Sequence, residues 1–290
     1  MTNLELFNFT QIQNARITNV ASIPQRSPFR YPGGKTWLIP IVRKWLKSFD
    51  SGQITLVDAF AGGGIVGLTA AFENLAEKII MIEKDEEVAA VWKTILGPEN
   101  HWLADKILSF NLTMENVQKE LNKPEKIMKE LGFCTILKNR IFHGGILAKG
   151  SGLIKHGENG KGIASRWYPK TLNKRIMAMD FIKHKIKFIE GDAFKFLQGN
   201  ADKRRFCYFI DPPYTIAGRR LYTCHEVNHR KLFELCSKLK GNFLMTYDDS
   251  EEIRTLAHEF GFLYKAVPMK TTHHIQKFEL LISKSLNWFA

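Results

Sequence analysis

Residues 54–64 read Ile54-Thr55-Leu56-Val57-Asp58-Ala59-Phe60-Ala61-Gly62-Gly63-Gly64, and they indicate the architecture of the chain. The first five form an apolar run that predicts a buried strand, and a helix is expected from about Ile65. A strand, a glycine turn and a helix in this order make the first half of a nucleotide-binding βαβ unit. The spacing is not G-x-G-x-x-G, so the dinucleotide fingerprint is absent.

A second strand is expected over 78–82 and ends in Glu83, about 20 residues after the glycines. An acid at this place commonly binds ribose hydroxyls, although acids also end strands for solubility. Following the glycine turn, Glu83 favours an adenosine-containing cofactor. Further strands are predicted at 186–189, 206–210 and 242–247, and a final β-hairpin at 264–269 and 278–283. The pattern predicts a mostly parallel, doubly wound α/β sheet that ends in an antiparallel hairpin.

The tetrapeptide Asp211-Pro212-Pro213-Tyr214 follows the predicted strand 206–210 directly. It therefore lies at the carboxyl end of that strand, where open α/β sheets hold their ligands. The prolines lack N–H groups, so they stop the strand and leave carbonyl oxygens without a ladder partner. A carboxylate, these carbonyls and one aromatic face can hold a flat molecule that bears an amino group. The plainer alternative is a Pro-Pro turn with a tyrosine lid.

The segment Gly33-Gly34-Lys35-Thr36 precedes a helical pattern and resembles part of a phosphate-binding P-loop. That motif needs a glycine where this chain has Phe29, and no strand leads into the segment, so an NTPase is rejected. The remaining interpretation is a flexible turn at a helix start. Its N–H groups and Lys35 can face an anionic group such as a carboxylate.

The charge of the chain indicates a polyanionic partner. Its 290 residues suit one large domain with an insertion, or two domains, and carry a formal charge of +13. Nucleic acid is the usual partner of such a protein, and an anionic membrane surface is the alternative. Residues 138–187 contain twelve Lys or Arg against two acids, and residues 144–162 contain seven glycines. We interpret this segment as a basic loop or hairpin that follows a phosphate backbone, rather than as a solvated face.

Cysteine usage and hydropathy predict a cytoplasmic protein. The four cysteines are far apart and form no C-x-x-C pair, which argues against zinc and against a disulfide framework. No apolar run approaches membrane-spanning length, and no signal peptide is recognised before the first polar residues. We expect no metal, no membrane association, and a monomer or weak dimer that is nucleoid-associated in a bacterial or phage-infected cell.

Three motifs taken in order resemble the signature of the Dam-type DNA adenine-N6 methyltransferases. They are residues 31–35 (Tyr-Pro-Gly-Gly-Lys), residues 58–64 and residues 211–214, with support from Glu83, Gly191-Asp192 and Leu221-Tyr222. The resemblance covers about residues 27–95 and 185–290. It implies a Rossmann-like methyltransferase fold with an inserted helical and loop target-recognition domain. The expected division is an arm at 1–26, a catalytic domain at 27–95 and 183–290, and a basic recognition insert at 96–182.

The resemblance also implies S-adenosylmethionine as the methyl donor. The residues implied at its methionine end are Tyr31, Gly33, Gly34 and Lys35. Those implied elsewhere around the cofactor are Asp58, Phe60 and Gly62 in the floor, Glu83 at the ribose, Asp192 at the adenine amino group, and Asp211. The implied catalytic residues are Asp211, Pro212, Pro213 and Tyr214.

The chemistry of the tetrapeptide agrees with this family. The amine of adenine is a poor nucleophile, because its lone pair is delocalised into the ring. Hydrogen bonds to the Asp211 carboxylate and the Pro212 carbonyl would draw that lone pair out of conjugation. A duplex base must be flipped out to reach such a pocket, where Tyr214 would stack on it. We therefore predict a site-specific methyltransferase that acts on adenine N6 in double-stranded DNA. The alternatives are an RNA adenine-N6, DNA cytosine-N4 or protein-glutamine enzyme, and a non-catalytic nucleic-acid-binding protein.

The insert departs from the family pattern, so the sequence leaves the recognition site open. Arg140 is predicted either to read a guanine edge bidentately or to clamp a phosphate. Arg219 and Arg220 are predicted to bind the strand near the flipped base, and the alternative is that they are simply solvated. The nucleic-acid-binding candidates are Arg140, Lys149, Lys155, Lys161, Arg166, Lys170, Arg219 and Arg220.

Overall fold

The computed structural model describes residues 19–31, 33–148, 150–157, 160–213, 227–270 and 276–289. At its centre is a seven-stranded sheet in the order β3-β2-β1-β4-β5-β7-β6. The strands are β1 (Thr55–Asp58), β2 (Lys78–Glu83), β3 (Ile186–Glu190), β4 (Phe206–Ile210), β5 (Asn242–Asp248), β6 (Leu263–Lys270) and β7 (Gln276–Ser283). All the predicted strands are present, and their ends differ from the prediction by one or two residues.

The sheet is parallel from β3 to β5, and β7 runs antiparallel to both β5 and β6. The predicted terminal hairpin is therefore confirmed, with β7 inserted between β5 and β6. The chain leaves β1 toward β2 and β3 and then returns to β4 on the other side of β1. This reversal makes the β1–β4 boundary the topological switch point, where ligands of such sheets bind. The predicted fold class, a Rossmann-like methyltransferase fold, is confirmed.

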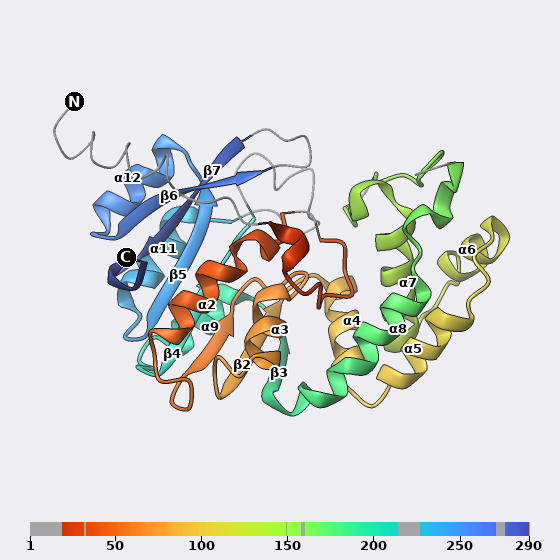
Figure 1. The fold of residues 1–290 in the computed structure, drawn as a ribbon, viewed down its shortest axis with the longest axis horizontal. Helices are drawn as coiled ribbons and strands as arrows, with labels where there is room; N and C mark the ends of the chain where they lie inside the picture. The colour runs from red at the N-terminus through yellow and green to blue at the C-terminus, as the bar shows by residue number, and fades with distance from the viewer. Residues whose placement is uncertain are drawn as a thin grey trace.

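Both faces of the sheet are apolar because both are covered by helices (Figure 1). Along β4, Cys207 and Phe209 pack into one core cluster, and Tyr208 and Ile210 pack into the other. The first cluster includes α2 (Ile39–Lys47), α3 (Ile65–Phe72) and α4 (Glu86–Leu96). The second includes α9 (Ala193–Gly199), α11 (His229–Lys238) and α12 (Glu251–Glu259). Helices on both faces fix the sheet, so its carboxyl edge is a rigid platform.

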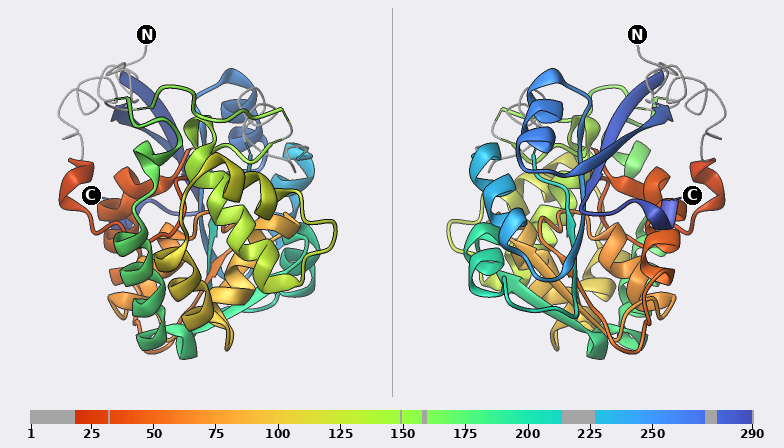
Figure 2. Two further views of the ribbon diagram at one scale, coloured as in Figure 1. Left: turned by 90° about the vertical axis from the view of Figure 1, so that its right-hand side faces the viewer. Right: turned by 90° about the vertical axis from the view of Figure 1, so that its left-hand side faces the viewer.

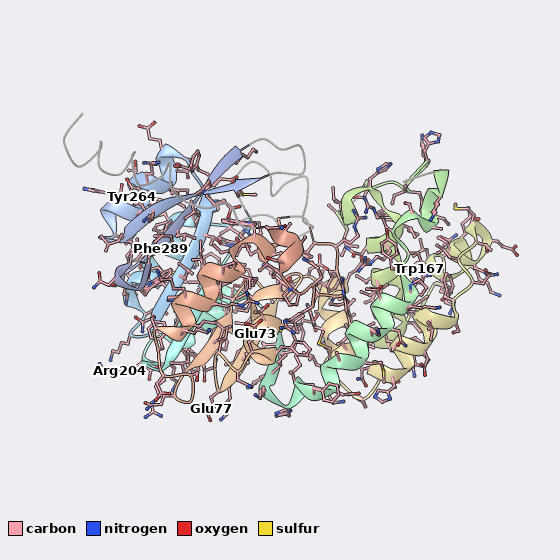
Figure 3. The ribbon with its side chains drawn as sticks, in the orientation of Figure 1. Glu73, Glu77, Trp167, Arg204, Tyr264 and Phe289 are labelled. Atoms are coloured by element: carbon pink, nitrogen blue, oxygen red, sulfur yellow. The ribbon has the colours of Figure 1, made fainter. Side chains whose placement is uncertain are left out.

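The region between β2 and β3 adds helices beside the β3 end of the sheet (Figure 1), and these helices face the viewer in the left view of Figure 2. Helix α7 (Met128–Ile141), which follows α6 (Met114–Leu121) in the chain, packs on α4, and α8 (Pro169–Met177) packs on α5 (Asn100–Ser109). The chain between α7 and α8 contains the short 3-10 helices η3 (His143–Gly145) and η5 (Gly162–Arg166). Trp167, labelled in Figure 3, packs its ring against Phe110 of this region, so it belongs to the core and not to a binding surface.

Helix α7 is closed at its amino end by a residue of its own first turn. It begins at Met128 because the Glu130 carboxylate accepts a hydrogen bond from the Ile127 N–H and closes the first turn. No helix in the described part of the chain is long and apolar enough to cross a membrane.

Candidate active site

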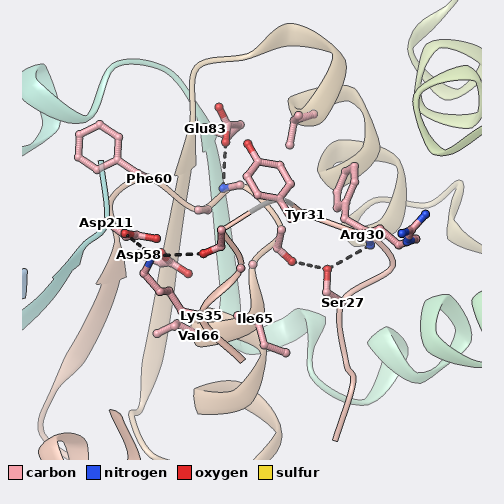
Figure 4. A pocket seen from close by; sticks show the side chains of 18 of the residues that line it. Ser27, Arg30, Tyr31, Lys35, Asp58, Phe60, Ile65, Val66, Glu83 and Asp211 are labelled. Carbon is pink, nitrogen blue, oxygen red and sulfur yellow. Dashed lines mark hydrogen bonds and ion pairs between the residues drawn. The ribbon is translucent and has the colours of Figure 1, made fainter. Parts of the chain in front are cut away.

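The carboxyl ends of the parallel strands form the floor of a cavity of about 1460 Å³ (Figure 4). Four strands have an acidic residue at or directly after their carboxyl end: Asp58 ends β1, Glu83 ends β2, Asp211 follows β4 and Asp248 ends β5. All four line the cavity, because parallel strands bring their carboxyl ends to one edge. The described cofactor and catalytic candidates all line it too: Tyr31, Gly33, Gly34, Lys35, Asp58, Phe60, Gly62, Glu83, Asp192, Asp211, Pro212 and Pro213.

The glycine turn after β1 is shaped by Tyr31. Gly62 has a φ of +47°, and a Cβ built on it would lie 2.6 Å from the Tyr31 ring. Only glycine allows both this backbone conformation and this close contact. Ser27 donates a hydrogen bond from its hydroxyl to the Gly63 carbonyl and ties the same lead-in segment to the turn. The residues before Lys35 therefore cover one side of the turn.

Glu83 is oriented by three backbone hydrogen bonds. Its Oε2 accepts from the Gly62 N–H at 2.9 Å, and its Oε1 accepts from the N–H groups of Lys84 and Asp85, each at 2.8 Å. Burial raises the pKa of Glu83 to about 7, and the Asp85 charge adds to the rise, against the effect of these hydrogen bonds. A carboxylate offers about four lone-pair sites and three are used here, so Glu83 can still accept from one hydroxyl of a vicinal diol.

Asp58 is a buried carboxyl with one backbone hydrogen bond. It is 3% exposed, and its Oδ2 accepts from the Gly67 N–H in the first turn of α3 at 3.1 Å. Burial raises the pKa of Asp58 to about 8, and the charges of Asp211 and Glu83 add to the rise. A cation bound in the cavity would relieve this repulsion and favour the ionised form.

Lys35 lies between two carboxylates, as Figure 4 shows for Asp211. Its Nζ is 3.0 Å from Asp211 Oδ1 and 3.4 Å from Glu279 Oε2, and it donates to the Gly33 carbonyl at 3.2 Å. Burial acts to lower the pKa of Lys35, but the charges of Asp211 and Glu279 outweigh it and raise that pKa. Lys35 was predicted at the methionine end of the cofactor, and its ammonium group also forms an ion pair with Asp211, a catalytic candidate.

Besides Lys35, Thr246 of β5 also contacts Asp211, and its hydroxyl donates to Asp211 Oδ1 at 2.6 Å. Neither Thr246 nor Glu279 was expected at the site from the sequence. Glu279 is 4% exposed and faces Lys35 from β7, a strand that the chain reaches about 70 residues after Asp211. An acid inside the apolar run of a predicted strand is a signal that an interior partner exists. The identity of that partner depends on the strand register.

Asp192 and Phe60 line the neighbouring part of the cavity. Asp192 caps α9 by accepting from the Phe194 N–H at 2.8 Å, and its Oδ2 is 3.4 Å from Lys84 Nζ. The rings of Phe60 and Phe194 meet edge to face with centroids 6.5 Å apart. Two aromatic rings beside a polar cap suit a planar heterocycle with an amino group.

The nucleic-acid candidates fall into two groups. Arg140 and Arg166 line the cavity on the side of the insert, and Arg140 is buried there. Lys155, Lys161 and Lys170 are exposed on the surface of the insert. Tyr214, Lys149, Arg219 and Arg220 lie outside the described residues, as do Leu221 and Tyr222.

The cavity fits S-adenosylmethionine on its own chemistry. Oriented Glu83 suits ribose hydroxyls, Phe60 and Phe194 suit an adenine ring, and the buried acids suit a ligand that carries a sulfonium and an ammonium. Within the described residues, no three His, Cys, Asp or Glu side chains gather in a way that could hold a metal ion.

No family model matches the chain, and no curated protein matches it. Among solved structures it is similar to a proposed RNA methyltransferase from Pyrococcus horikoshii (12% identity, 97% of this chain and 98% of that chain covered, TM-score 0.40). It is also similar to an rRNA methyltransferase from Streptomyces viridochromogenes (14% identity, 84% and 82% covered, TM-score 0.39). A third is precorrin-6y C5,15-methyltransferase from Geobacter metallireducens (9% identity, 93% and 92% covered, TM-score 0.38). Likenesses this low carry no substrate over to this chain.

Proposed function

We propose that the protein is an S-adenosylmethionine-dependent DNA methyltransferase that acts on the N6 amine of a flipped-out adenine. The observation that carries the proposal is that Asp211 and Pro212 line one cavity with the glycine turn and Glu83. An amine-binding group and a nucleoside-binding group thus lie together at the topological switch point.

In this proposal S-adenosylmethionine, when bound, supplies an electrophilic methyl group on a sulfonium. Glu83 would bind its ribose hydroxyls, and Asp192 with Phe60 would bind its adenine end. Asp58 and the segment 27–34, which includes Tyr31, would surround its methionine end.

Asp211 and the Pro212 carbonyl would accept the two N–H groups of the target amine. This keeps the nitrogen lone pair directed out of the ring plane and toward the donor. Lys35 and Thr246 both contact Asp211 Oδ1, so the carboxylate is fixed before the base arrives. After transfer, Asp211 is the nearest group suited to accept the amine proton.

The basic insert supports a nucleic acid substrate. Residues 138–187 carry most of the excess positive charge, and Arg140 and Arg166 from this segment border the cavity directly. A phosphate backbone bound along the insert would bring a base to Asp211. Asp211, the first residue of the tetrapeptide, favours adenine over cytosine as the target base. Cytosine-N4 methyltransferases typically have serine at this position of the corresponding tetrapeptide.

The test is methyl transfer from a labelled donor to duplex DNA, RNA or protein, each offered separately. We expect label in DNA, on adenine, and its loss in Asp211→Ala. Label in RNA alone would overturn the choice of substrate, and label on cytosine would overturn the choice of base. Cofactor binding without transfer to any substrate would leave a nucleic-acid-binding protein.

A further inference from the structure

An arginine pair lies at the border between the insert and the segment before Lys35. Arg140 comes from the end of α7 and Arg175 from α8, and both line the cavity described above. The charges of Arg175 and Arg30 both act on Arg140, so three guanidinium groups are close enough to repel one another. Cations gathered in this way mark a place where an anion is expected.

Arg140 is buried without full use of its donors. Its side chain is only 4% exposed, and its Nη2 donates to the Pro28 carbonyl. Its Nε is buried and has no hydrogen-bond partner among the residues that the structure describes. Burying an N–H group without a partner costs free energy, and the cost is larger for a charged group, so the retention of this arginine needs a reason.

Neither guanidinium is neutralised by an acid. Arg175 donates from Nη1 to the Ser27 carbonyl at 2.8 Å, and neither it nor Arg140 forms an ion pair with any described residue. Burial and the neighbouring arginines lower the pKa of Arg140 to about 9, and burial also lowers the pKa of Arg175. The protein thus keeps one buried and one half-buried cation, and both donate to backbone carbonyls.

The pair also joins two parts of the chain that border the site. Asn139, next to Arg140, accepts from the Arg30 N–H at 2.8 Å and donates to the Arg30 carbonyl at 3.0 Å. A Cβ on Gly145 would lie 2.4 Å from the same carbonyl, so the backbones of the two parts touch. An anion between Arg140 and Arg175 would therefore fix the insert against the segment that carries Tyr31.

We propose that Arg140 and Arg175 form a binding site for a phosphodiester group of the nucleic acid substrate. The Arg140 guanidinium is buried and donates to the Pro28 carbonyl, so it does not extend to the edge of a base in a DNA groove. This argues against a role for Arg140 in reading bases. A tetrahedral oxyanion that enters the cavity can use the buried Nε. The choice of nucleic acid as the source of the phosphate rests on the proposed function.

The experiment compares wild-type protein with Arg140→Gln and with the control Arg204→Gln. Arg204 is exposed and lies far from the cavity, at the other end of the sheet (Figure 3). Inorganic phosphate should raise the melting temperature of the wild type and of the control, but not that of Arg140→Gln. Duplex DNA should bind Arg140→Gln about tenfold more weakly than the wild type, whatever its sequence. The slope of log affinity against log salt should fall in magnitude by about one.

Unchanged phosphate stabilisation and an unchanged salt slope in Arg140→Gln would overturn the proposal. Weaker discrimination between DNA sequences at an unchanged slope would also overturn it, in favour of base reading. If Arg140→Gln does not fold, Arg175→Gln answers the same question, because Arg175 makes its bond from a half-buried position. Phosphate binding that needs Arg140 in a protein with no affinity for DNA would instead refute nucleic acid as the source. The phosphate measurement needs no methyl transfer, so it is independent of the failure of the proposed activity.

Discussion

The cavity has an acidic half and a basic half, and the two are stabilised in opposite ways. In the acidic half, Glu83, Asp58 and Asp211 each accept hydrogen bonds from neighbouring residues, and Lys35 lies between Asp211 and Glu279. In the basic half, Arg140 and Arg175 contact backbone carbonyls and no described acid. The acids of the acidic half therefore have hydrogen-bond or ion-pair partners within the protein. The arginines of the basic half would gain a partner of opposite charge only when an anion binds.

This difference assigns the two halves to two ligands. The acids suit a donor that carries positive charge, and the arginines suit a phosphate of the acceptor. Asp211 lies in the acidic half and faces the space shared by both. The substitutions below disturb the acidic half, in order of decreasing expected effect.

Asp211→Ala should reduce methyl transfer at least a thousandfold, because it removes the group that accepts the amine N–H and orients the lone pair. The cofactor should still bind, since Lys35 keeps Glu279 as a partner and the fold survives. Single-turnover transfer and calorimetric cofactor binding measure the two effects. The control is Asp202→Ala, at an exposed position before β4. Full activity in Asp211→Ala would disprove its catalytic role.

Glu83→Gln should weaken cofactor affinity about a hundredfold, because an amide replaces one of the two oxygens that now accept three backbone N–H groups. Titration calorimetry measures the affinity. Glu77→Gln is the matched control, since Glu77 is exposed at the other end of the sheet (Figure 3). Equal affinities in Glu83→Gln and the wild type would exclude Glu83 from the ribose site.

Cofactor affinity should rise with pH, by more than tenfold between pH 6 and 7, where both carboxyls ionise, and by about tenfold between pH 7 and 8. The pKa of Asp58 is raised to about 8 and that of Glu83 to about 7, so both carboxyls hold protons below these values. A cationic ligand favours the ionised forms, so binding releases protons and strengthens as pH rises through each pKa. Asp58→Asn should flatten the upper part of this profile. A flat profile in the wild type would contradict the assignment of Asp58 to a cationic ligand.

Glu279→Gln should have the smallest effect. Lys35 keeps its contact with Asp211, so we expect a loss of about 1–2 kcal/mol in the free energy of unfolding and less than a tenfold loss in transfer rate. Denaturant unfolding measures the first quantity. A loss of transfer as large as that of Asp211→Ala would show that Glu279 acts on the reaction directly.

Much of the acidic half could be predicted from the sequence, because its residues lie at strand ends. Asp58, Glu83 and Asp211 each follow an apolar run, and a parallel sheet brings such ends together without further information. The glycine turn could also be predicted, because the strand, the glycines and the helix follow one another directly in the sequence. Local patterns therefore gave the fold and most of the cavity.

The partners of these residues could not be predicted. Glu279 meets Lys35 only because β7 pairs antiparallel with β5, and a shift of one residue would turn its side chain to the other face. The basic half is similar: Arg140 was expected to meet nucleic acid at a surface, and its burial follows from the packing of α7 against the segment 27–31. Arg175 was not identified, because an arginine in an amphipathic helix has no distinguishing local signal.

The most direct test is long-read modification mapping of DNA from cells that express the wild type or Asp211→Ala. We expect modified adenines at fixed sequence positions in the wild-type sample and their absence in the variant. Modified cytosines, no modification, or equal modification in both samples would contradict adenine-N6 transfer at Asp211.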